Sequence, residues 1–184
     1  SITGIQNIPN FNYCYQIMFK AKAGRQSDDK YLIYNDDELS VSNTPTTSNS
    51  YFNIISAEDC NQYLKIKKHN SSKFIKTDSL LGSGIKLGGD DNVNTKIIVS
   101  PKEEIGDLGI DIDTVFIPNT NGLTKEGAYT NVFFNSGKDY DNWLSFLALN
   151  NNNQLYVSNK SYNDLDNDPR IRDNINGNFL DNYE

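Results

Sequence analysis

The chain has 184 residues, a net charge of −7, and 36% hydrophobic and 11% aromatic residues. That length supports one domain with a real core. The acidic balance argues against nucleic acid as the main partner, because phosphate binding depends on clustered lysine and arginine. No stretch approaches the roughly 18 apolar residues that a membrane-spanning helix needs, so we expect no membrane span.

The side-chain types favour strands, since eleven tyrosines and nine phenylalanines stand against one methionine. Runs with apolar residues at alternate positions predict strands at 13–19, 31–35, 39–43, 51–55, 63–67, 74–78, 85–89, 96–99, 114–118, 129–134, 146–150 and 155–159. A weaker run lies at 170–172 or 178–180, and we expect the Asn- and Asp-rich tail from residue 164 onward to be loosely ordered. The sequence therefore predicts an all-β fold.

Three of these segments, 31–43, 74–89 and 146–159, share one pattern. Each begins with an aromatic and an aliphatic residue, reaches Asn or Asp before a polar turn, and continues with two aliphatic residues at alternate positions. Period-two alternation around a turn rich in Asn, Asp and Gly predicts a β-hairpin. The pattern aligns Leu32, Ile75 and Leu147 as equivalent core residues.

Three units of about four strands resemble the β-trefoil superfamily, in which three hairpins close one end of a six-stranded barrel. The resemblance implies a single domain over 1–184 with about twelve strands in three pseudo-repeats. The units span about 12–59, 60–101 and 128–175, with an insertion at about 102–127 that carries the strand-like run 114–118. In an alternative, residues 115–117 are the first barrel strand of the third unit.

The sequence offers little for catalysis. His69 is the only histidine, and its lysine-rich surroundings favour a solvated surface side chain. Without a second histidine we expect no Ser–His, Cys–His or zinc arrangement. The acidic run 164–168 has the oxygen spacing of a calcium loop, but Pro169 and Ile175 replace the Gly and Glu that an EF-hand needs. We therefore expect no enzyme, no cofactor and no metal ion; for the run 164–168 a solvated acidic turn is the favoured interpretation, and a looser calcium site is the alternative.

Cysteine use and localisation stay open. Cys14 and Cys60 could form a disulfide in a secreted protein, but two unpaired thiols that pack as small apolar residues are the favoured interpretation. No leader is visible in the sequence, and a secreted location is favoured over a cytoplasmic one.

One basic cluster surrounds Lys65 and Lys67, which alternate with Leu64 and Ile66. The alternation predicts that both lysines face outward on one strand. A solvated strand face is the favoured interpretation, and a site for an anionic glycan or an acidic partner is the alternative.

The trefoil resemblance implies a binding module, because the superfamily holds sugar-binding lectins, protease inhibitors, cytokine-like ligands and few enzymes. Ricin-like lectins bind sugar around the second hairpin strand and the loop after it, and the corresponding loops here are 43–50, 89–94 and 159–164. The Gln-x-Trp signature of those lectins is absent from all three units. The candidate ligand-binding residues are Asp90, Asp91, Asn92, Asn94, Asp141, Trp143, Asn159 and Tyr162.

These residues suit carbohydrate, since aromatic faces stack on sugar C–H surfaces and Asn and Asp bond sugar hydroxyls. Trp143 has two interpretations, a sugar platform or a core residue, so the loop 89–94 is the safer candidate. The sequence thus favours a non-catalytic carbohydrate-binding module whose partner is a glycan or glycoprotein. The alternative is a protein-binding trefoil, such as a protease inhibitor or a toxin-accessory or adhesin component.

Overall fold

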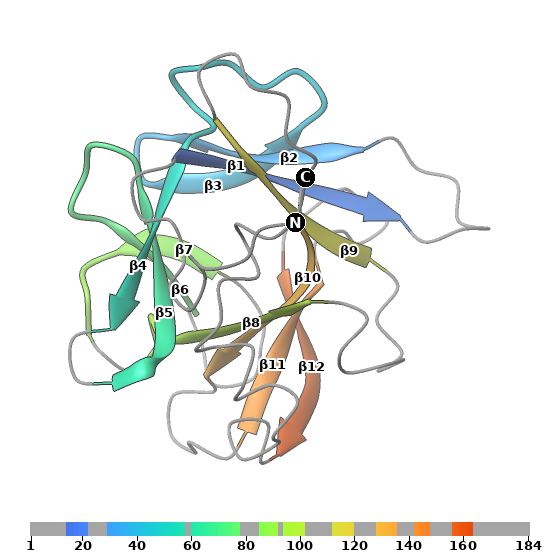
Figure 1. Ribbon diagram of the computed structural model, residues 1–184. Coiled ribbons are helices and arrows are strands. Elements are labelled where there is room, and N and C mark those ends of the chain that lie inside the picture. The colour runs from blue at the N-terminus through green and yellow to red at the C-terminus, as the bar shows by residue number, and fades with distance from the viewer. Residues whose placement is uncertain are drawn as a thin grey trace, which may run out of the picture.

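The computed structural model describes residues 14–21, 29–57, 60–77, 85–91, 94–101, 112–119, 128–135, 142–147 and 156–163. Within these ranges the chain forms strands and no helix (Figure 1). The strands are β1 (Cys14–Ala21), β2 (Lys30–Asn35), β3 (Glu38–Ser42), β4 (Phe52–Ala57), β5 (Cys60–Lys68), β6 (Phe74–Thr77), β7 (Ile85–Gly88), β8 (Ile97–Pro101), β9 (Ile112–Pro118), β10 (Ala128–Asn135), β11 (Asn142–Leu147) and β12 (Tyr156–Asn163).

The all-β prediction is confirmed for this part of the chain, and each described strand overlaps a predicted run. The weaker run at 170–172 or 178–180 and the tail from 164 lie outside the described residues. No helix among the described residues is long and apolar enough to cross a membrane.

Six strands form a ring of antiparallel pairings. From β1 the pairing passes to β4, β5, β8, β10 and β9, and β9 pairs with β1 again. The link between β5 and β8 is a single pair, Leu64 with Ile97. The sheet is therefore nearly closed into a barrel, with the hairpin β2–β3 beside β1, β6–β7 beside β5, and β11–β12 beside β10 (Figure 1).

The core follows from period-two alternation along these strands. Tyr15, Ile17 and Phe19 alternate along β1 with no exposed surface, and Phe52 and Ile54 do the same along β4. The core cluster also takes in Leu64, Ile66, Ile97, Phe116 and Val132 from the remaining strands of the ring. Each such side chain contributes about 1.5–3 kcal/mol by leaving water, so the ring is held mainly by its inward face.

The registers around the ring repeat three times. Strands β1, β5 and β10 each pair with one neighbour in the ring at a matching position: Ile17 faces Phe116 of β9, Ile66 faces Ile54 of β4, and Val132 faces Val99 of β8. Two residues earlier, β1, β5 and β10 each pair with their other neighbour in the ring: Tyr15 faces Phe52 of β4, Leu64 faces Ile97 of β8, and Thr130 faces Thr114 of β9. Strands β1, β5 and β10 therefore have equivalent places, as do β4, β8 and β9.

The hairpins continue this correspondence and correct one prediction. Each pairs an equivalent residue with an aliphatic partner: Leu32 with Val41, Ile75 with Leu87, and Phe146 with Val157. Phe146 rather than Leu147 thus corresponds to Leu32 and Ile75, and the predicted alignment of the third hairpin is wrong by one residue. One cause is that β10 pairs Phe133 with Ser145, so a serine stands at the position that is aromatic in the first two hairpins. A second cause is that the β11–β12 ladder is irregular between Leu144 and Phe146.

Strand β9 lies within the segment expected as an insertion. It joins the ring between β1 and β10, and it pairs with β1 over seven residues, from Tyr15–Pro118 to Ala21–Ile112. The strand that follows β8 around the ring is β10 and not β9. The extended piece is therefore a member of the barrel, and it comes before the third hairpin in the chain, whereas β4 and β8 come after theirs.

Candidate functional site

Two loops occupy equivalent places in the first repeat unit (β1 to β4) and the second (β5 to β8). The first loop, residues 43–51, connects β3 to β4, and the second loop, residues 89–96, connects β7 to β8. The backbone N–H of Tyr34 donates to the carbonyl of Asn49 at 2.9 Å, and that of Thr77 donates to the carbonyl of Asn94 at 3.3 Å. Each donor lies two residues after the equivalent core residues Leu32 and Ile75, so the same backbone bond holds both loops.

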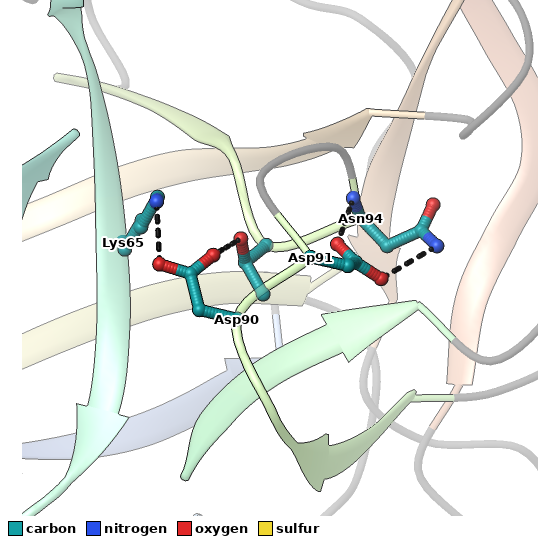
Figure 2. Close-up of polar contacts among 5 residues, drawn as sticks. Lys65, Asp90, Asp91 and Asn94 are labelled. Carbon is teal, nitrogen blue, oxygen red and sulfur yellow. Dashed lines mark hydrogen bonds and ion pairs between the residues drawn. The ribbon is translucent and has the colours of Figure 1, made fainter. Parts of the chain in front are cut away.

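The second loop is also held by its two aspartates (Figure 2). Asp90 accepts from Lys65 Nζ at 2.7 Å and from Thr95 Oγ1 at 2.8 Å. Asp91 accepts from the backbone N–H of Asn94 at 2.8 Å and from its Nδ2 at 3.1 Å, and forms an ion pair with Lys76 at 2.6 Å. Both carboxylates therefore fix the backbone of the loop while 30% and 35% of their side-chain surfaces stay exposed.

The prediction that Lys65 faces solvent is wrong. Its side chain is 1% exposed, although it alternates with the core residues Leu64 and Ile66 as expected. The second loop places Asp90 against the outer face of β5, and the Phe74 ring centroid lies 6.0 Å from Lys65 Nζ. A buried ammonium group needs such a partner, because an unpaired charge away from water is costly. Lys67 is half-buried and donates to the carbonyl of Ser71 at 3.1 Å.

The first loop is held by an equivalent contact between uncharged side chains. Gln16, which precedes Ile17 as Lys65 precedes Ile66, donates through Nε2 to Ser50 Oγ at 3.0 Å. The Ser50 hydroxyl donates in turn to the carbonyl of Thr46. Ser50 and Thr95 are both fully buried hydroxyl residues, each two positions before an equivalent core residue, Phe52 or Ile97. We name Gln16–Ser50 the neutral tether and Lys65–Asp90–Thr95 the charged tether.

The outer part of the first loop presents hydroxyl groups in fixed positions. Thr44 and Ser42 share a hydrogen bond of 3.1 Å, as do Thr46 and Ser48. The backbone N–H of Thr46 donates to Asn49 Oδ1 at 2.8 Å. Because Thr44, Thr46 and Ser48 are exposed, these groups are ordered by the loop and open to solvent.

The predicted ligand-binding residues divide into three sets. Asp90, Asp91 and Asn94 lie together in the second loop. Asn92 and Asp141 lie outside the described residues. Trp143 lies in β11 and Asn159 and Tyr162 lie in β12, where Trp143 and Tyr162 are paired positions of the ladder.

A further polar cluster, Cys14–Asn53–His69, brings the histidine beside a thiol, whereas the sequence led us to expect no Cys–His contact. His69 Nδ1 lies 2.9 Å from Asn53 Oδ1 and 3.5 Å from Cys14 Sγ, which is a free thiol. His69 Nε2 lies 3.8 Å from the same sulfur. All three residues are half-buried, so the interpretation of His69 as a solvated side chain is wrong. The contact joins residues 55 positions apart, and no local motif in the sequence indicates it.

Tyr34 has a phenol whose pKa is raised in the folded protein. Burial raises the pKa of its phenol above the ordinary value of 10.0; the hydrogen bond to the Tyr51 carbonyl opposes this, and Cys14 adds to it. That hydrogen bond is 3.1 Å long, and Lys68 Nζ lies 4.7 Å from the ring centroid. The neutral phenol is therefore the favoured form in the folded protein.

Among the residues that the structure describes, no group of three or more His, Cys, Asp or Glu side chains is placed to hold a metal ion. No family model, curated protein or solved structure matches this chain. The geometry of the loops and of the polar cluster is therefore the basis for the functional argument.

Proposed function

We propose that the chain is a non-catalytic binding module of the β-trefoil type that recognises carbohydrate through the loops after its hairpins. The observation that carries the proposal is the repeated anchoring of the first and second loops. Each loop is tied at equivalent positions by a backbone hydrogen bond and by a tether from the first strand of its unit.

The trefoil assignment is supported by the threefold repetition of register around the ring and by a hairpin beside each of β1, β5 and β10. The position of β9 in the chain departs from a simple repeat of three successive units. In this proposal β9 takes the place in the third unit that β4 and β8, the strands after the hairpins, have in the first two units.

Carbohydrate suits these loops because sugars are recognised by fixed arrays of hydroxyl, amide and carboxylate groups. The second loop offers Asp90, Asp91 and Asn94, and the first loop offers the exposed hydroxyls of Thr44 and Thr46. Groups that are already ordered lose little conformational entropy when a ligand binds. The third hairpin contributes two aromatic residues, Trp143 and Tyr162, at paired positions of its ladder.

The test is a glycan array probed with the whole chain, followed by titration of the selected glycan with tryptophan fluorescence. We expect saturable binding to one glycan class. Asp91→Asn should weaken that binding about tenfold, since a charge-assisted hydrogen bond contributes about 1.5–3 kcal/mol. A change in fluorescence would report on Trp143, the only tryptophan.

The matched control is Asp37→Asn, which makes the same chemical change at a 57% exposed side chain in the turn of the first hairpin. It should leave glycan affinity unchanged. Equal losses in both variants would count against the second loop. A blank array together with specific capture of a protein would favour the protein-binding alternative and overturn the carbohydrate assignment.

A further inference from the structure

The outer face of strands β4 to β7 carries a row of four paired residues, Asn53–Lys67–Phe74–Gly88, which we name the outer row. Asn53 pairs with Lys67, Lys67 with Phe74, and Phe74 with Gly88. Each of the four stands next to a buried core residue of its own strand: Ile54, Ile66, Ile75 or Leu87. Because side chains alternate along a strand and paired residues share a face, the outer row points away from the core.

The second loop lies beside the outer row. Lys65 precedes Lys67 by two residues on β5, and it binds Asp90 of the second loop at 2.7 Å (Figure 2). The next residue of that loop, Asp91, forms its ion pair with Lys76 of β6 at 2.6 Å. Two residues of a strand span about 7 Å, so the outer row and the two carboxylates are within reach of one oligosaccharide.

Lys67 differs from these two lysines in its partner. Its Nζ donates to the carbonyl of Ser71 at 3.1 Å, and within the described ranges no carboxylate forms an ion pair with it. A carbonyl holds the ammonium group in place but leaves its charge uncompensated, although the whole chain has a net charge of −7. A half-buried cation that is fixed in this way can bind an incoming anion without first losing an ion pair.

Phe74 supplies an apolar surface beside this charge. Its side chain is partly exposed, and its paired residue Gly88 has no side chain to cover it. The stem of Lys76 passes over Gly88 instead, with Cδ 2.9 Å from where a Cβ would lie. An aromatic ring stacks on the C–H face of a sugar, and an ammonium group binds a carboxylate or a sulfate. The outer row therefore offers both contacts that an acidic sugar requires.

We propose that Lys67 and Phe74 form a subsite for an acidic sugar, one that carries a carboxylate or a sulfate group, next to the second loop. This subsite rests on the proposed carbohydrate function, to which it adds the charge of the glycan. Sugar hydroxyls donate to Asp90 and Asp91 while the anionic group binds Lys67. An acidic peptide suits this surface less well, because its carboxylates would meet those of the two aspartates.

The first experiment is a glycan array in which each neutral oligosaccharide is printed beside its sialylated and its sulfated form, probed with the whole chain. We expect one acidic form to bind about tenfold more tightly than its neutral partner, and the two acidic forms distinguish carboxylate from sulfate. Equal binding to neutral and acidic partners would overturn the subsite and leave the carbohydrate function in place. An array without any binding would overturn both.

Calorimetric titration of the selected acidic glycan into variants then tests the two residues. Lys67→Gln should weaken binding about tenfold and remove most of its salt dependence, whereas Lys67→Arg keeps the charge and should retain both. The neutral partner should bind Lys67→Gln and the parent alike. Phe74→Leu should weaken both glycans by a similar factor, because the ring stacks on neutral and acidic sugars equally.

The matched control is Lys68→Gln. The Nζ of Lys68 also donates to a backbone carbonyl, that of Asp36 at 2.9 Å, but Lys68 pairs with the core residue Phe52 and its Nζ lies 4.7 Å from the centroid of the Tyr34 ring. It is therefore on the face opposite Lys67, and the control should leave the affinity for the acidic glycan unchanged. Equal losses in Lys67→Gln and Lys68→Gln would indicate general charge attraction and overturn the subsite.

Two further measurements complete the test. Circular dichroism verifies the fold of each variant, and the array comparison needs no variant, so it decides the question if a variant does not fold. Poly-glutamate is the probe for an acidic peptide and should bind at least tenfold more weakly than the acidic glycan, by about the same factor as one lost charge-assisted hydrogen bond. Binding of poly-glutamate as tight as that of the glycan, with a loss in Lys67→Gln, would assign the surface to an acidic protein and overturn the subsite.

Discussion

The neutral and charged tethers solve one structural problem with different chemistry. Gln16 and Lys65 occupy equivalent positions on β1 and β5, and each reaches the loop that precedes the last strand of its unit. In the first unit an amide meets the hydroxyl of Ser50 directly. In the second unit the carboxylate of Asp90 stands between the ammonium group and the hydroxyl of Thr95.

The difference shows that this position requires a hydrogen-bond partner for the loop but does not specify its charge. The half-buried amide of Gln16 needs only its hydrogen bonds, whereas the buried Lys65 also needs an anion. The charged tether is therefore more vulnerable to loss of one partner, and the neutral tether is more tolerant.

The largest expected effects come from core substitutions in the hairpins, and they test whether the third hairpin is equivalent to the first two. Leu32→Ala and Ile75→Ala should each lower the free energy of unfolding by about 2–5 kcal/mol, because both side chains are fully buried. If register equivalence extends to the third hairpin, Phe146→Ala should cost about 3–5 kcal/mol and Leu147→Ala clearly less. Urea denaturation measures all four, and a larger loss at Leu147 would restore the alignment based on aromatic residues.

The charged tether can be broken by Asp90→Ala. We expect the free energy of unfolding to fall by about 3 kcal/mol, since Lys65 would remain buried without its carboxylate. The double variant Lys65→Gln with Asp90→Asn imitates the neutral tether and should recover at least half of that loss. If the double variant is as unstable as Asp90→Ala, loss of the ion pair between Lys65 and Asp90 is not the cause.

The neutral tether should respond less. Ser50→Ala removes the acceptor of Gln16 Nε2 and the donor to the Thr46 carbonyl. We expect a loss of about 1 kcal/mol in chemical denaturation, because the half-buried Gln16 amide and the Thr46 carbonyl each lose a neutral hydrogen bond. Ser48→Ala, an exposed hydroxyl of the same loop, is the matched control and should change stability little. A loss equal to that of Asp90→Ala would contradict the distinction between the two tethers.

The smallest expected loss of stability comes from Tyr34, which in the first unit is equivalent to Thr77 in the second. Its pKa is raised above 10.0 in the folded state, chiefly by burial. The folded state therefore holds the phenolic proton more tightly than the unfolded state, so this stabilisation is complete below about pH 10 and is lost as pH rises through the raised pKa. Tyr34→Phe should lose about 1 kcal/mol at pH 7 with its hydrogen bond to Tyr51.

Denaturation of the parent and of Tyr34→Phe between pH 8 and 11.5 measures this dependence. We expect the stability difference between the two proteins to shrink as the pH rises. A constant difference over the whole range would show that Tyr34 ionises equally in both states.

The strands were predictable because alternation is a local signal. The hairpin turn at Asp36 was also predictable, and Asp36 has the positive φ of 53° that such a turn needs. The burial of Lys65 was not predictable, since alternation assigns a face but does not reveal that the second loop covers it. The contact of Cys14 with His69 was equally hidden, because it joins residues 55 positions apart and depends on the pairing of β1 with β4 and of β4 with β5.

Of the candidate site, the sequence identified Asp90, Asp91 and Asn94 as one loop, and the structure brings them together. The sequence did not indicate that Asp90 and Asp91 form ion pairs with Lys65 and Lys76. The third hairpin was displaced by one residue because an aromatic side chain was used as the marker of equivalence. Register, which is set by hydrogen bonding with β10, is a property of the pairing and not of the residue type.

The position of β9 before the third hairpin also bears on how the barrel folds. Strands β9 and β10 are neighbours in the chain and can pair locally, whereas β9 meets β1 across a separation of about 100 residues, as between Tyr15 and Pro118. Long-range pairings carry the larger entropic cost and form late. We therefore expect the last step of closure to be the docking of a preformed β9–β10 pair, a step that needs no residue beyond Asn135.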